Sequence, residues 1–163
     1  MVLKIEANSV NKIDASETAK AVTNFLHDDF QNLLNTAGLH RITDLSSPIL
    51  SATPPDHSKE NNQEKNVVDG LHEADVAKNA CYAVFATIND LTQTARKPFK
   101  KVVQDIFIKG YTIERTSYDI NKSTRSINNY KREALVEFAN RFNIWKIQYH
   151  RTDLPDLRRW CSE

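Results

Sequence analysis

Arginine and asparagine side chains that can hydrogen-bond to DNA bases recur at helical spacing between Ser123 and Arg132. An arginine side chain can form two hydrogen bonds to guanine, and an asparagine side chain can form two to adenine. Each such pair is worth roughly 1 to 3 kcal/mol of discrimination against the wrong base. The residues expected to face DNA are Ser123, Thr124, Arg125, Asn128, Asn129 and Arg132, with Lys122 and Lys131 at the flanks. None of them is acidic. The pattern predicts a DNA-reading helix, although any exposed helix face can carry such residues.

The residues before this helix have the features of a helix-turn-helix. Thr112 can cap a first helix, Ser117 is small where the two helices must touch, and Asn121 tolerates the positive φ of the turn. Ser123 or Thr124 can cap the second helix. The expected inner faces are Ile113, Thr116, Ser117 and Ile120 in the first helix and Ile127, Tyr130, Ala134 and Phe138 in the second.

Composition favours helices and conceals an uneven charge. The 163 residues include 3 glycines and are 26% charged, which favours helices over a turn-rich β-fold. The formal net charge is +1, yet residues 1–70 hold 6 Lys or Arg against 10 Asp or Glu, and residues 71–163 hold 16 against 11. Between Arg96 and Arg132 there are 10 basic and 3 acidic residues. Such a local excess is typical of a nucleic-acid surface, although lysines 97, 100 and 101 also fit an ordinary solvated surface.

The sequence lacks the motifs of several other classes. Two cysteines, Cys81 and Cys161, are too few and too far apart for a disulfide framework or a zinc site. There is no His-Glu-x-x-His, no glycine-rich phosphate loop and no nucleophile elbow, so we expect neither an enzyme nor a cofactor. No segment has the apolar length of a signal peptide core or a membrane span. We therefore expect a cytoplasmic protein, associated with the nucleoid, that does not interact with membranes.

Apolar periodicity predicts an all-α fold. A helix over about 15–37 is favoured by the Asp14/Glu17 capping pattern and is ended by Gly38. A second is expected from about His72 to Ala95, with heptad-like apolar spacing that favours core packing over a coiled coil. A third begins near Pro98 and stops at Gly110.

The segment between the first two helices is rich in proline and polar residues, which predicts a flexible linker. We therefore expect an N-terminal helical segment over 1–44 that is only tethered, a linker over 45–70, and a helix-turn-helix domain over 71–163. The tail beyond Trp145 combines aromatic and basic residues, a composition compatible with DNA or partner contact and more often with packing onto the domain.

Several segments together resemble the ArpU family of phage-encoded transcriptional regulators of Gram-positive bacteria. They are the helix start at Ile13-Asp14, the segments 47–51 (SPILS) and 86–91 (ATINDL), and above all residues 123–139 (STRSINNYKREALVEFA). The resemblance covers about residues 13–142. It departs from the family pattern at the turn, where Asn121 and Lys122 stand in place of glycine and an apolar residue, and in the first helix, where Thr116-Ser117 stands in place of Ile-Ala.

The resemblance implies a helix-turn-helix similar to region four of bacterial sigma factors. It also implies binding to a promoter or operator in double-stranded DNA, control of late genes for packaging, morphogenesis and lysis, and assistance to RNA polymerase. An alternative is a module that docks on RNA polymerase or another protein without reading bases, for which an apolar exposed stripe is expected. A homodimer is also expected, because two half-sites raise affinity together; the heptad-spaced helix or the N-terminal helix is the candidate contact.

Overall fold

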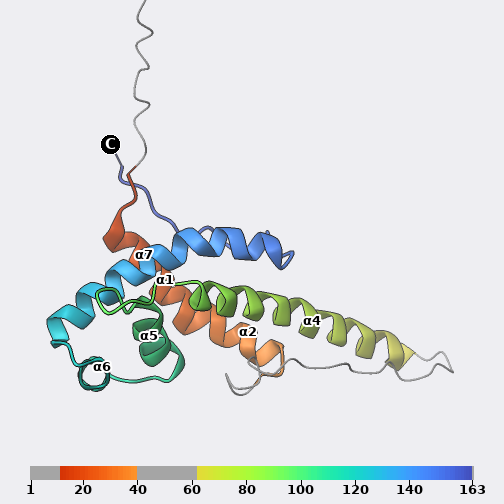
Figure 1. Cartoon of the computed structure of the whole chain (residues 1–163). Coiled ribbons are helices and arrows are strands. Elements are labelled where there is room, and N and C mark those ends of the chain that lie inside the picture. Colours follow the sequence, from red (N-terminus) through yellow and green to blue (C-terminus); the bar gives the residue numbers. More distant parts are fainter. Residues whose placement is uncertain (1–11, 40–61, 163) are drawn as a thin grey trace, which may run out of the picture.

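The structure is a computed structural model that describes residues 12–39 and 62–162. All of its named elements are helical (Figure 1), so the predicted all-α class is confirmed. In chain order they are α1 Ala15–Asn24, η1 Phe25–Asp29, α2 Phe30–Thr36, α4 Asn62–Asn89, α5 Phe99–Val103, η2 Gln104–Ile108, α6 Ile113–Ile120 and α7 Thr124–Gln148. The elements η1 and η2 are single wide π turns inside otherwise α-helical segments. None of the helices in the described ranges is long and apolar enough to cross a membrane.

The N-terminal helix begins and ends as the sequence predicts. The Asp14 carboxylate accepts a hydrogen bond from the Glu17 backbone N–H at 3.0 Å, which caps α1. The helix continues through η1 and α2, and Gly38 follows with a positive φ of 68°. Glycine adopts this conformation without a steric penalty, so it stops the helix cleanly.

The prediction that this helix is only tethered to the rest is wrong. Its apolar face, including Val22, Phe25 and Phe30, belongs to the same buried cluster as α4 and α7. Figure 1 shows α1 crossing α7 while α2 lies along α4. Apolar side chains at helical spacing need a partner surface, and here the partner is the remainder of the chain.

Helix α4 differs from the prediction at both ends. It begins at Asn62, so residues 62–70, predicted as linker, are helical. Once packing holds a helix, each added residue gains one hydrogen bond for fixing only its own backbone, so extension is easier than starting a new helix. At the other end α4 stops at Asn89, not Ala95, and the backbone N–H and hydroxyl of Thr92 bond the Glu137 carboxylate at 2.8 and 2.9 Å. The rest of the predicted linker, residues 45–61 with the segment 47–51, lies outside the described residues.

The core lies where α1, α4 and α7 meet. Phe142 of α7 is fully buried and contacts Phe25 and Phe138, with ring centroids 5.2 and 5.5 Å away. The heptad-spaced residues from Ala77 to Ile88 of α4, and Leu91 just beyond its end, are buried here, which confirms core packing as their role. Ala95, the last residue of the predicted pattern, is exposed. Burial also raises the pKa of the Cys81 thiol to about 12, so it is an unreactive core residue.

The C-terminal tail packs back onto α1. The backbone N–H of Asp14 donates to the Arg159 carbonyl, and that of Cys161 donates to the Lys12 carbonyl, both at 2.9 Å. Thr18 is fully buried, and its hydroxyl accepts a hydrogen bond from the Arg159 backbone N–H at 2.9 Å. The tail therefore fixes the beginning of α1, and Figure 1 shows the C-terminus beside it.

Candidate nucleic-acid interface

The turn between α6 and α7 has the geometry that its residue types predict. The Thr112 hydroxyl accepts from the Arg115 backbone N–H at 3.2 Å and caps α6. Asn121 follows α6 in the left-handed conformation, with φ 55° and ψ 51°. Of the two candidate caps for α7, Ser123 takes the role, accepting from the Ser126 backbone N–H at 3.2 Å.

Ser117 and Lys122 lock this turn by two hydrogen bonds. The Lys122 backbone N–H donates to the Ser117 carbonyl at 3.1 Å, and the Ser117 hydroxyl donates to the Lys122 carbonyl at 2.5 Å. Ser117 was expected to be small and to face inward, so its hydrogen bond to Lys122 is a finding of the structure. The two bonds set the angle at which α7 leaves the turn.

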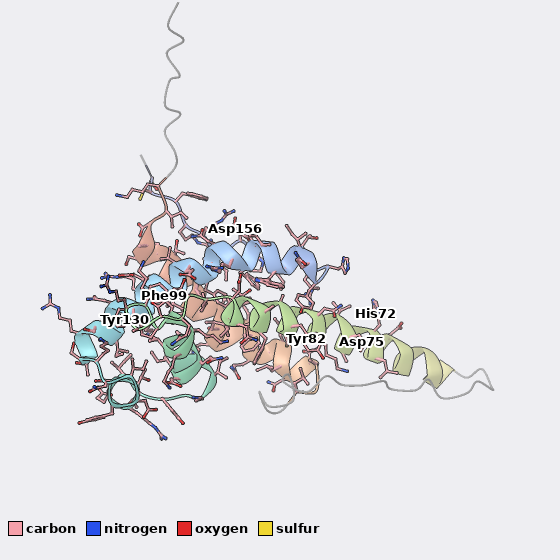
Figure 2. All side chains as sticks on the ribbon, in the orientation of Figure 1. His72, Asp75, Tyr82, Phe99, Tyr130 and Asp156 are labelled. Carbon is pink, nitrogen blue, oxygen red and sulfur yellow. The ribbon has the colours of Figure 1, made fainter. Side chains whose placement is uncertain are left out.

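The inner face of α7 is placed as predicted, whereas on α6 Ile113, Ser117 and Ile120 are only half-buried. Ile127, Ala134 and Phe138 of α7 are fully buried, and Tyr130 is half-buried against Phe99 of α5 at 6.3 Å between ring centroids. Figure 2 labels Phe99 and Tyr130 where α5 meets α7. On α6, Thr116 is fully buried, and its hydroxyl has no hydrogen-bond partner among the described residues. The buried side of α6 thus carries an unsatisfied hydroxyl group that an apolar residue would not have.

A buried carboxylate joins the scaffold to the start of α6. Asp105 is fully buried, and its carboxylate oxygens lie 3.0 Å from the Lys101 ammonium nitrogen and 2.7 Å from that of Lys109. The hydrogen bond to the Asp105 carboxylate raises the pKa of Lys109 above the ordinary lysine value. The backbone carbonyl of Asp105 accepts a hydrogen bond from the Tyr111 backbone N–H at 2.8 Å. Lys101, predicted to be a solvated or phosphate-binding lysine, therefore has a structural partner.

Seven of the eight predicted DNA-facing residues are exposed at the beginning of α7 and in the turn before it. They are Lys122, Ser123, Thr124, Arg125, Asn128, Asn129 and Arg132. The exception is Lys131, which is half-buried with its ammonium group 5.6 Å from the centre of the Phe107 ring. Lys131 therefore lies at the side of the surface formed by the other seven, which we call the α7 polar face.

Some basic residues of the protein are paired with a carboxylate and others are not. Lysines 78, 101 and 109 and arginines 141, 151 and 158 each pair with a carboxylate. Among the side chains described, those of residues 12–39 and 69–162, no carboxylate forms a salt bridge with Lys122, Arg125 or Arg132. Their charge is therefore not neutralised by a described partner and is available to an anion.

A groove beside the α7 polar face includes residues that the sequence did not indicate. Its walls are one side of α1 and one side of α7, lined by Ser16, Ala19, Lys20, Thr23, Asn128, Lys131, Arg132 and Leu135. Spacing alone places Ser16, Lys20 and Thr23 on one helix face, yet it does not show which helix they adjoin. A second groove, between the 93–98 loop and the turn, is lined in part by Lys101 and Lys122.

Comparison with protein-family models, curated proteins and solved structures gives no match to this chain. In the part of the chain that the structure describes, no group of three or more His, Cys, Asp or Glu side chains is arranged to hold a metal ion.

Proposed function

We propose that the protein is a sequence-specific DNA-binding transcriptional regulator that reads bases with the beginning of α7. The observation that carries this proposal is the α7 polar face, in which arginine and asparagine side chains without salt-bridge partners among the described residues are exposed on a rigid, capped helix. In helix-turn-helix proteins the first turns of the second helix meet base edges, while the first helix crosses the phosphate backbone. Helix α7 packs on α5, and α6 packs on α7 and η2, which leaves this part of α7 exposed.

Arg125 and Asn128 are the residues best suited to base readout. They are separated by three positions, so they lie on neighbouring parts of one helix face, and both are exposed. A guanidinium group matches the two acceptors of guanine, and an amide matches the acceptor and donor of adenine. Lys122 and Arg132 would supply phosphate contacts at the edges of the face.

The resemblance to the ArpU family supports a narrower proposal. It rests most strongly on residues 123–139, which include most of the α7 polar face. On that basis the targets would be promoters or operators of phage late genes in a bacterial host, with RNA polymerase as a second partner. The location would be the host cytoplasm, at the nucleoid.

A second candidate function is docking on RNA polymerase or another protein without base readout. The observation that favours it is Tyr118 of α6, which is 85% exposed although it is a large aromatic residue. Exposed tyrosine is typical of protein interfaces. The α7 polar face has no comparable apolar stripe, which favours DNA as the principal partner.

A homodimer remains a prediction, and the structure limits how it can form. The heptad-spaced face of α4 and the apolar face of α1 are buried in the protein's own core. Neither face is therefore available as a dimer contact, so a contact through α4 or α1 would have to use another side of the helix. Light scattering of the protein with and without a two-half-site duplex would measure the stoichiometry.

The direct test is a binding titration against fragments tiled across late-operon promoters of the phage or prophage that encodes the protein, from about 50 to about 200 mM salt. Sequence-specific readout predicts that one fragment keeps the protein at the higher salt while the others release it, because base contacts depend less on counterion release than phosphate contacts do. Equal release of all fragments, or no binding, would contradict the proposal. A pull-down with RNA polymerase would then test the docking alternative.

A further inference from the structure

The groove between α1 and α7 has the chemistry of a phosphate-binding surface. Three cations line it: Lys20 from α1, and Lys131 and Arg132 from α7. The other lining residues are apolar or neutral and polar, and no carboxylate is among them. Glu17, the acidic residue of the first turn of α1, is not part of the lining. An anion entering the groove would therefore meet positive charge and hydrogen-bond donors.

The groove is continuous with the α7 polar face. Asn128 and Arg132 belong to both, since they lie on the side of α7 that adjoins α1. A helix in the major groove of DNA has a sugar-phosphate strand on either side, because the groove is only about 12 Å wide. An element alongside the reading helix thus lies where the phosphates of one strand run.

The wall formed by α1 is held rigidly. Ala19 and the fully buried Val22 face the protein, and the C-terminal tail bonds to Asp14 and Thr18. Lys20 is exposed, and no carboxylate in the described part of the chain forms a salt bridge with it. Its ammonium group is therefore carried by a fixed helix and remains available for an external partner.

We propose that α1 is part of the DNA interface and that Lys20 contacts a backbone phosphate of the strand bordering the major groove that α7 enters. This inference rests on the proposed function. It assigns α1 a binding role in addition to its place in the core, and it gives the interface a second wall that the helix-turn-helix alone does not supply. Ser16, one turn before Lys20, adds a neutral hydrogen-bond donor to the same groove.

The test compares Lys20→Gln with Lys78→Gln, which removes the same charge from α4, where Lys78 pairs with Asp75 at 3.7 Å. Both variants and the wild type are titrated by fluorescence anisotropy with the preferred promoter fragment and with a scrambled duplex, from about 50 to about 200 mM salt. Loss of one phosphate contact predicts that Lys20→Gln reduces the salt dependence of Kd across this range by about 3.5-fold. The reduction should be equal for both duplexes, because phosphate contacts carry no sequence information. Lys78→Gln should match the wild type.

The outcomes separate this inference from the proposed function. If the wild type prefers one fragment but Lys20→Gln keeps the wild-type salt slope, the role of α1 is wrong and the proposed function stands. The same conclusion follows if Lys78→Gln lowers the slope equally, since the effect is then one of overall charge. If the wild type binds no duplex, both proposals fail. Circular dichroism of each variant checks that the helices are intact.

Discussion

The start of α7 and the opposite end, formed by the second half of α7 and the tail after it, use their arginines differently. Where the second half of α7 meets α4 and the tail, Arg141 bridges Asp90 and Glu137, at 3.1 and 2.9 Å, and Arg151 and Arg158 pair with Asp153 and Asp156. At the start of α7, Arg125 and Arg132 form no salt bridge with a described carboxylate. The same residue type therefore stabilises the fold in one region and remains available for binding in the other.

This difference explains why a charge count describes the protein poorly. Ten basic residues lie between Arg96 and Arg132, yet Lys101 and Lys109 are engaged by the buried Asp105. Arg115 stacks on Tyr111, with its guanidinium carbon 3.9 Å from the ring centroid. The cations that matter for a ligand are those whose neighbours leave them available, and only the folded arrangement distinguishes them.

The largest expected effect is on the core that both ends share. Phe142→Ala should lower the free energy of unfolding by about 3 to 5 kcal/mol, because it removes a fully buried ring between Phe25 and Phe138. Urea unfolding followed by circular dichroism measures this. Ile144→Ala is the matched control, since Ile144 lies on the same helix and is 61% exposed; its cost should be much smaller. Equal costs would mean that the core is assigned to the wrong face of α7.

Arg125→Ala should separate the two ends most clearly. It is expected to weaken binding to the preferred promoter fragment by roughly 1 to 3 kcal/mol, or about 5- to 150-fold in Kd, while leaving thermal stability unchanged. Lys78→Ala on α4, where Lys78 pairs with Asp75, should leave Kd unchanged. Anisotropy titration and a thermal melt of each variant provide both readouts. A lower melting temperature for Arg125→Ala would show that the side chain belongs to the fold.

Thr116→Val in α6 should raise the free energy of unfolding slightly. The Thr116 hydroxyl is buried without a described hydrogen-bond partner, and valine has nearly the same shape. Removing an unsatisfied polar group is worth on the order of 1 kcal/mol. A rise in the urea midpoint, with specific DNA affinity retained, is the expected result; a fall would reveal a hydrogen bond that the hydroxyl makes in solution.

The smallest expected effect is on how stability depends on pH at the Asp156–Arg158 pair in the tail after α7. Hydrogen bonds from Arg158 hold the pKa of Asp156 well below its usual value. A lowered pKa in the folded state contributes stability above the unfolded value of about 3.9, and this contribution is lost as the pH falls through the folded pKa. Asp156→Asn should therefore be less stable than wild type near neutral pH, and the difference should shrink as the pH falls below the unfolded value. A constant difference across this range would assign the effect to packing.

Local patterns in the sequence were sufficient for much of the fold. The Asp14 and Thr112 caps, the left-handed Asn121 and the buried face of α7 follow from residue type and spacing within a few positions. The exposure of the candidate site could also be predicted from the sequence, since seven of its eight residues are exposed as expected. Such features depend on interactions between near neighbours in the chain, which the order of residues specifies directly.

Tertiary structure alone decided the rest. Apolar periodicity showed that α1 has a buried face, but it did not show that the face packs on α7 and brings Lys20 beside Arg132. The end of α4 at Asn89 likewise depends on contacts between Thr92 and Glu137, which are 45 positions apart. Pairing of distant residues is set by how the whole core closes, because burial stabilises whichever helix faces fit together, and spacing along one helix carries no record of its partner.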